Sequence, residues 1–231
     1  MEIEAKNNYI LVEDIGSVKR TAGGLYLPDR IDQEPRWFKV VQAGPGLPDM
    51  FGNIQRLDYQ PGEYVYVFPH AVHQVNLKHY GPDYPDEQIT FVSEGDVLVR
   101  SREPSSLQFQ PVGSYCIIHK IQIPESRTAG GIYLPDQSVP PPSLAKVLAV
   151  GTGYRTAATG VFGLLAGMAG LDVSRLRELV KEHVPLSVQP GDTVLIVSTA
   201  PMKLSLEQFG MKEVYYIVGE ADILAVLRSD E

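Results

Sequence analysis

The chain has few of the features that mark secreted, membrane or nucleic-acid-binding proteins. It has a single cysteine among its 231 residues, so it can form neither a disulfide framework nor a cysteine-rich metal site. No apolar run approaches the roughly 20 residues that span a membrane. The net charge of -8, with Lys and Arg scattered and no basic block, disfavours a nucleic-acid partner.

The first residues also lack the apolar core of a secretory signal. Residues 1–6 read Met-Glu-Ile-Glu-Ala-Lys, which is acidic rather than basic and apolar. Together with the single cysteine, this favours a soluble protein of a reducing, cytoplasmic compartment. Cys116 itself stands inside the apolar run at residues 115–118, a position typical of a small buried hydrophobe.

What the sequence has instead is one pattern, present twice. Residues 21–28 read Thr-Ala-Gly-Gly-Leu-Tyr-Leu-Pro, residues 128–135 read Thr-Ala-Gly-Gly-Ile-Tyr-Leu-Pro, and an aspartate follows both. Nineteen residues after each threonine begins a strand-like run that ends in Gly-x-Gly, at residues 40–46 and 147–153. The common register indicates a tandem duplication.

Both copies predict an all-β fold of small barrels. Short runs rich in Val, Ile, Tyr and Leu alternate with turns of Gly, Pro and Asp. Pro-Gly pairs at residues 61–62 and 190–191 predict turns in which glycine has a positive φ. The predicted organisation is a first domain at residues 1–102, a short linker at 103–112 and a second domain at 113–231.

The second copy differs from the first mainly by an insertion at residues 154–187. An amphipathic helix is predicted there, capped by Asp172 or Ser174 and ended by Pro185. The apolar, glycine-rich run at residues 160–171 has two interpretations. It is either a second helix or turn packed on the first, or an exposed patch for self-association or for an unfolded client.

Five motifs in a fixed order, each duplicated, make the chain resemble the GroES family, the co-chaperonins that cap group I chaperonin rings. They are an apolar strand, a Gly-Gly-aliphatic-Tyr-Leu-Pro segment, a strand ending in Gly-x-Gly, a Pro-Gly-acidic turn and a closing Asp-x-Leu strand. The motifs occupy residues 10–12, 22–28, 40–46, 61–63 and 96–98, and again 116–118, 129–135, 147–153, 190–192 and 222–224. The resemblance implies two tandem GroES-like β-barrels, as in plastid or phage-encoded relatives, with a helical insertion in the second.

The resemblance also implies a mobile loop in each copy that grips the chaperonin. The glycine pair would let the loop turn sharply, and the triplet after it would supply apolar anchors. The implied chaperonin-binding residues are Gly23, Gly24, Leu25, Tyr26 and Leu27, and Gly130, Gly131, Ile132, Tyr133 and Leu134. The alternative interpretation is that both segments are hairpin turns that lead into a strand.

A co-chaperonin of this kind is expected to be a homo-oligomer that needs no cofactor and no metal and is not an enzyme. Its expected partner is a group I chaperonin ring in the ATP or ADP state, with no nucleic acid and no membrane involved. Two departures from the family stand out. Tyr26 and Tyr133 are bulkier than the usual aliphatic residue, and two domains per chain do not divide evenly into a sevenfold ring.

Three other functions compete with this one. Gly151-Thr-Gly153 lacks the third glycine of a dinucleotide fingerprint, which argues against a dehydrogenase. His70, His73 and His79 include a His-x-x-His pair, but no cysteine or adjacent carboxylate completes a metal site. The last rival is a structural protein of a phage virion, such as a capsid decoration or tail component, with the two loops as fixed arms.

Overall fold

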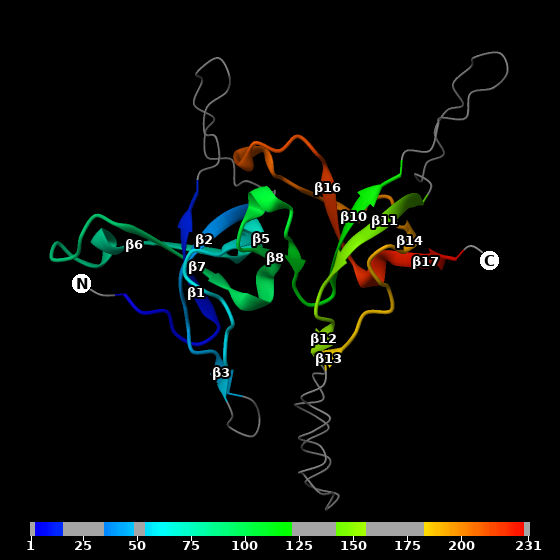
Figure 1. Cartoon of the computed structure of the whole chain (residues 1–231). Coiled ribbons are helices and arrows are strands. Elements are labelled where there is room, and N and C mark those ends of the chain that lie inside the picture. Colours follow the sequence, from blue (N-terminus) through cyan, green and yellow to red (C-terminus); the bar gives the residue numbers. More distant parts are fainter. Residues whose placement is uncertain (1–2, 16–34, 49–53, 122–141, 156–182, 229–231) are drawn as a thin grey trace, which may run out of the picture. The chain divides into compact units, whose positions relative to one another are not determined.

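The structure is a computed structural model that describes residues 3–15, 35–48, 54–121, 142–155 and 183–228. These residues form two compact units that correspond to the two copies; the first comprises the described residues up to Phe109 together with Arg155, and the second comprises the others. Each unit is built on an antiparallel sheet of short strands (Figure 1). The all-β prediction is therefore confirmed for the described part of the chain.

The first sheet has seven strands in the order β6-β7-β1-β2-β5-β8-β9, and all of them except β9 (Gln110–Pro111) belong to the first unit. Their bounds are β1 Tyr9–Asp14, β2 Arg36–Ala43, β5 Tyr64–Val67, β6 Val72–Asn76, β7 Gln88–Ser93 and β8 Val97–Ser101. The two-residue strands β3 (Leu47–Pro48) and β4 (Ile54–Gln55) pair separately. Short 3-10 turns occur at η1 Pro69–Ala71, η2 Leu77–Tyr80, η3 Glu94–Asp96 and η4 Pro104–Ser106.

The second unit repeats the order of the six strands β6-β7-β1-β2-β5-β8. After β9 (Gln110–Pro111), its sheet has the order β15-β16-β10-β11-β14-β17. The strands are β10 Tyr115–Lys120, β11 Ser143–Val150, β14 Thr193–Ile196, β15 Met202–Leu204, β16 Tyr215–Gly219 and β17 Ile223–Leu227, with turns η5 Glu207–Phe209 and η6 Glu220–Asp222. The tandem duplication predicted from the sequence thus extends to the order of the strands.

The irregularities of the two sheets are duplicated as well. The register between β1 and β2 shifts between Leu11 and Val12, and the register between β10 and β11 shifts at the equivalent residues, Ile117 and Ile118. A second shift occurs between β5 and β8 at Tyr66/Val67, and between β14 and β17 at the equivalent pair. Bulges increase local twist and bend a strand, so the two sheets are bent at the same places.

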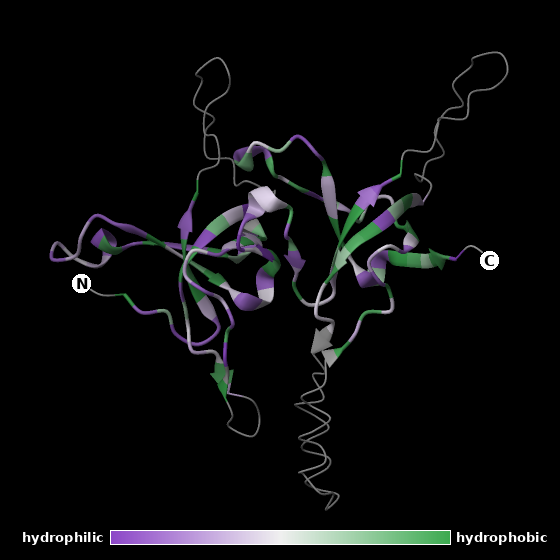
Figure 2. Cartoon of the chain, in the orientation of Figure 1, coloured by the Kyte–Doolittle hydropathy of each residue, from purple (hydrophilic) through white to green (hydrophobic). Residues whose placement is uncertain are grey.

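Alternating residues of these strands form the core of each unit. In β11, Ala145 and Val147 are buried, whereas Lys146 and Leu148 between and after them are exposed. Cys116, on the neighbouring strand, is fully buried, as its position in an apolar run predicted. The second core also contains Ile118, Val188, Val194, Ile196 and Val218. Figure 2 shows the hydrophobic strands that supply these side chains.

The predicted helix of the insertion lies for the most part outside the described residues. The prediction is wrong at its end, where His183–Val184 form β13 and pair with β12 (Tyr154–Arg155). Val184 is β-branched and precedes Pro185, and both properties disfavour helical backbone and favour an extended one. The described residues include no α-helix, and so none long and apolar enough to cross a membrane.

Candidate functional site

The predicted binding segments are the connections of two equivalent strand pairs. Residues 15–35 join β1 to β2, and residues 121–142 join β10 to β11. The two strand pairs have the same antiparallel register up to their ends, where Asp14 lies opposite Phe38 and Lys120 lies opposite Ala145. Each connection therefore leaves its sheet from the same place in the fold.

The ten predicted binding residues themselves lie outside the described residues. They are Gly23, Gly24, Leu25, Tyr26 and Leu27 in the first copy, and Gly130, Gly131, Ile132, Tyr133 and Leu134 in the second. What the structure defines is the base from which each of the two segments starts and to which it returns.

The base of the first segment is held by charged and aromatic side chains. Asp14 Oδ2 lies 3.3 Å from Arg36 Nη1, so the last residue of β1 is paired with the first residue of β2. The Arg36 guanidinium also lies 5.0 Å from the centre of the Phe38 ring, which is a cation–π distance. The two ends of the segment are thereby tied together at the sheet.

The base of the second segment is closed by different groups. The Ile121 amide donates to the Leu144 carbonyl at 2.8 Å, which extends the strand pairing by one bond. The Ser143 hydroxyl lies 3.3 Å from the Ser198 hydroxyl, and the Lys120 ammonium lies 4.6 Å from the Tyr216 ring. The two copies thus share their backbone geometry but not the side chains at the base.

The Gly-x-Gly motif has a structural role that its pattern alone did not reveal. The Gly44 amide donates to the Tyr9 carbonyl at 2.9 Å, and the Gly46 amide donates to the Asn7 carbonyl at the same distance. A Cβ atom on Gly44 would lie only 2.4 Å from the Asn7 carbonyl oxygen. Gly46 has a φ of 98°, where glycine is favoured. The motif therefore fastens the end of β2 to the residues that precede β1.

The second copy repeats this fastening atom for atom. The Gly151 and Gly153 amides donate to the carbonyls of Tyr115 and Gly113, at 2.9 and 3.0 Å. A Cβ atom on Gly151 would lie 2.2 Å from the Gly113 oxygen, and Gly153 has a φ of 94°. The duplicated glycines are thus explained by close backbone approach, and they belong to the scaffold rather than to a nucleotide site.

The Pro-Gly turns also have the predicted conformation. Gly62 has a φ of 91° and Gly191 a φ of 98°, and their amides donate to the carbonyls of Val40 and Val147 at 2.8 Å. The acidic residue that follows the glycine caps the turn in both copies. The Gln60 amide donates to the carboxylate of Glu63 at 3.3 Å. The equivalent bond, from the Gln189 amide to the carboxylate of Asp192, measures 2.8 Å.

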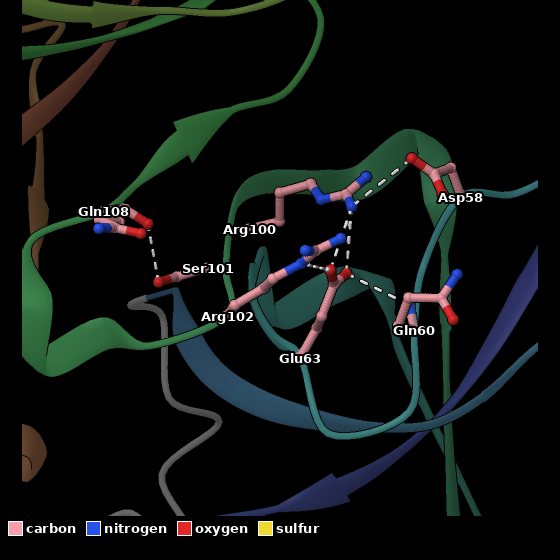
Figure 3. A network of polar contacts seen from close by, with 7 residues as sticks. All are labelled: Asp58, Gln60, Glu63, Arg100, Ser101, Arg102 and Gln108. Carbon is pink, nitrogen blue, oxygen red and sulfur yellow. Dashed lines mark hydrogen bonds and ion pairs between the residues drawn. The ribbon is translucent and has the colours of Figure 1, made fainter.

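In the first copy the turn carboxylate is the centre of a charged network. The side chain of Glu63 is buried, and its carboxylate lies 3.2 Å from Arg100 Nη2 and 3.0 Å from Arg102 Nε. Figure 3 shows Glu63 between the two arginines, with Asp58 on the far side of Arg100. The nearby Ser101 hydroxyl donates to the Gln108 carbonyl at 2.9 Å. This network fixes the end of β8 and the segment that follows it.

Other titratable groups occupy structural positions. Burial raises the pKa of the Cys116 thiol to about 12, which makes it a poor nucleophile at neutral pH. His70 stacks on Phe68 with ring centres 5.1 Å apart, and His73 meets the Tyr9 ring edge-on at 5.8 Å. Within the described ranges, no three His, Cys, Asp or Glu side chains are grouped as metal ligands would be.

Comparison with known proteins identifies the family to which this duplicated scaffold belongs. A family profile described as the chaperonin 10 Kd subunit matches residues 2–99 and 108–161, which is more than half of the chain and falls on both copies. The chain belongs to the chaperonin 10 family. The two matched segments agree with the tandem duplication seen in the strand order.

Individual relatives have modest identity to the chain. The co-chaperonin GroES of Thermus thermophilus is 31% identical over 119 residues, which are 52% of this chain and 91% of the relative. The co-chaperonin GroES of Coprothermobacter proteolyticus is 32% identical over 121 residues, or 52% of this chain and 96% of the relative. That of Nitratidesulfovibrio vulgaris is 31% identical over 77 residues, or 33% and 81%. About half of this chain thus corresponds to nearly the whole of such a relative.

The sequence patterns did not predict two features of the first copy. One is the network of Glu63 with its two arginines. The other is an apolar row on the outer side of the sheet, where Trp37 and Tyr66 pack with ring centres 5.0 Å apart. The aromatic residues at 37, 66 and 109 were the available signal, but only the pairing of distant strands brings them together.

Proposed function

We propose that the chain is a co-chaperonin that binds a group I chaperonin ring in its nucleotide-bound state, closes the folding chamber and so assists protein folding. The observation on which this depends most is the duplication of the loop base in a member of the chaperonin 10 family. Two equivalent strand pairs present connections of similar length and sequence, and the ring would be contacted through both.

The binding residues in this proposal are the glycine pairs and the triplets Leu25-Tyr26-Leu27 and Ile132-Tyr133-Leu134. Apolar side chains at such a contact bury area against a groove of the partner, and aromatic residues are common anchors. Ordering a glycine-rich segment lowers the affinity of each contact. Several loops acting together recover affinity, because after the first contact the others become intramolecular.

The protein itself would perform no chemistry, and the ATPase would belong to the chaperonin. We further propose two functional domains, at residues 1–102 and 113–231, joined by the linker at 103–112. The working form would be a homo-oligomer in the cytoplasm, with no nucleic acid and no membrane as partner. A virion protein is not proposed, since the relatives reported above are all named as co-chaperonins.

The test is a double variant, Leu27→Asp with Leu134→Asp, in a chaperonin co-sedimentation assay with and without nucleotide. A carboxylate at each anchor should abolish nucleotide-dependent co-sedimentation, because it would be desolvated in an apolar groove. The two single variants should each weaken capping more than twofold, since both loops contribute to the avidity.

The matched control is Tyr80→Asp, which also places a carboxylate at an apolar position, one that is 71% exposed in the first unit. This control should co-sediment like the wild-type protein. Circular dichroism should show that all variants are folded. Undiminished capping by the folded double variant would refute the assignment of the binding residues.

A further inference from the structure

The ion pair at the base of the first segment rests on a buried ring. Arg36 and Phe38 are two residues apart on β2, and Asp14 lies opposite Phe38 in the register of β1 and β2. All three side chains are therefore on the same face of the sheet. Phe38 is fully buried, and the guanidinium that lies 5.0 Å from its ring centre reaches Asp14 Oδ2 at 3.3 Å.

This pair is shielded more than an ordinary surface ion pair. The side chains of Arg36 and Asp14 are 24% and 31% exposed, whereas those of Lys78 and Asp86, in the connection between β6 and β7, are both 61% exposed. Exposed pairs contribute little, because water screens them and two mobile side chains must be ordered. Contact with the Phe38 ring already orders Arg36. The Asp14–Arg36 pair is thus suited to holding two parts of the chain together.

The parts that it holds are the two ends of the first segment. Asp14 is the last residue of β1 and Arg36 is the first residue of β2, so the pair joins the chain on either side of residues 15–35. The backbone pairing of β1 with β2 ends at Asp14 and Phe38, two residues short of Arg36. The ion pair therefore extends the closure of the base beyond the backbone hydrogen bonds.

The second copy has no equivalent of this pair. Lys120, Ser143 and Ala145 take the places of the aspartate, the arginine and the phenylalanine. A lysine and a serine cannot form an ion pair, and alanine offers no ring. The lysine ammonium lies 4.6 Å from the Tyr216 ring, and the serine hydroxyl lies 3.3 Å from that of Ser198. These two side chains are held by neighbouring parts of the second unit and not by each other.

We infer that Asp14 and Arg36 are positioning residues for chaperonin binding through the first segment, and that the second segment binds without such a pair. A pair that is formed before binding reduces the conformational freedom that the ends of the segment lose on binding, and this raises affinity. The two segments of one chain are thus unequal, since only the first depends on a charge pair at its base. The inference rests on the proposed co-chaperonin function.

Asp14→Asn tests this inference in two backgrounds. Leu134→Asp leaves the first segment as the active one, and Leu27→Asp leaves the second. The dissociation constant for a nucleotide-bound group I chaperonin ring is measured by titrated co-sedimentation. In the Leu134→Asp background, Asp14→Asn should raise this constant at least about threefold, because several copies of the weakened contact act together. In the Leu27→Asp background it should have no effect.

Two readouts separate positioning by charge from a purely structural role. Asp14→Glu keeps the carboxylate and should restore binding. The difference between Asp14→Asn and its parent should shrink at high salt, because a partly exposed ion pair is screened. The matched control is Asp86→Asn, which removes the carboxylate of the exposed pair with Lys78 in the same unit and should leave the dissociation constant unchanged. The fluorescence of Trp37 in urea checks that the variants are folded.

The outcomes distinguish this inference from the proposed function. If Asp14→Asn binds like its parent in the Leu134→Asp background, or weakens binding equally in both backgrounds, the positioning role is wrong. Co-sedimentation of the wild-type protein would then still support the co-chaperonin function. A folded wild-type protein that binds no group I chaperonin in any nucleotide state overturns both.

Discussion

The buried carboxylate of Glu63 leads to a prediction in which equivalent substitutions have different effects in the two copies. Glu63→Ala removes the acceptor for Arg100 and Arg102 and for the backbone amide of Gln60. The side chain of Arg100 is only 16% exposed, and it would keep Asp58, at 3.8 Å, as a solvent-exposed partner. The variant therefore leaves a largely buried cation with a weaker counter-charge.

The expected loss of stability follows from how far each of the two arginines is exposed. Removing one partner of a buried ion pair costs about 3–5 kcal/mol. Arg102 is 76% exposed and contributes little, as exposed pairs are worth about 0–1 kcal/mol. Arg100 also retains its contact with the Tyr59 ring, at 4.9 Å. We expect Glu63→Ala to lower the free energy of unfolding of the first unit by about 2–3 kcal/mol.

The assay uses the single tryptophan of the chain. Trp37 is buried in the first unit, so its fluorescence in a urea titration reports the unfolding of that unit. With a urea slope of about 1.5 kcal/mol per molar, the midpoint should fall by roughly 1.5 M. All titrations are made at one protein concentration, because assembly stabilises the folded state.

The matched control is Asp192→Ala at the equivalent turn. This carboxylate accepts from Gln189 but has Val226 where the first copy has Arg100. Loss of that hydrogen bond costs about 1 kcal/mol, and it falls in the other unit. The tryptophan midpoint should therefore not move. A Glu63→Ala midpoint within about 0.3 M of wild type, on the order of the extrapolation error, would refute the assigned role of the network.

Two further predictions concern the scaffold. Gly44→Ala should destabilise the first unit by at least about 2 kcal/mol, because the new Cβ would lie 2.4 Å from a carbonyl oxygen. The control Gly95→Ala should be nearly neutral, because the nearest atom to its Cβ lies 3.8 Å away. Equal urea midpoints for the two variants would contradict this prediction. Burial raises the pKa of Cys116 from 9.0 to about 12, so the folded state holds this proton more tightly than the unfolded chain. Stability of the second unit should therefore be lost as pH rises from about 9 towards 12, with the loss by about pH 10.5 on the order of 2 kcal/mol larger than in Cys116→Val. If the stability of the wild-type protein and that of Cys116→Val change in parallel with pH, this prediction is wrong.

Much of the scaffold was predictable because it depends on local residue patterns. Alternating apolar runs predicted β1, β5 and β8, and the Pro-Gly pairs predicted turns with positive φ, as found at Gly62 and Gly191. The duplication itself was predictable from the repeated motifs, and the strand order repeats it. Each of these features is determined by residues close together in the sequence.

What could not be predicted depends on contacts between distant segments. β2 begins at Arg36, four residues before the apolar run at Val40 that signalled it. The covering of Trp37 by Phe109 joins segments far apart in the chain. The end of the insertion was predicted as helix by its periodicity, but Val184 forms a strand, because pairing with β12 and the following proline favour extended backbone.

The candidate site was likewise predicted from the sequence only in part. The positions of the two connecting segments, between β1 and β2 and between β10 and β11, agree with the sequence prediction. The assignment of the triplets as anchors remains a prediction, because no contact of theirs is described. The differing side chains at the two bases, an Asp14–Arg36 pair in one copy and a Ser143–Ser198 contact in the other, were not predicted.

The most direct test of the account is the effect of the purified protein on a group I chaperonin. Co-sedimentation and ATP turnover would be measured together, with ATP, with ADP and without nucleotide. The account predicts binding only when nucleotide is present, accompanied by a changed rate of ATP hydrolysis. An assembled, folded protein that neither co-sediments nor alters ATP turnover under any of the three conditions would contradict it.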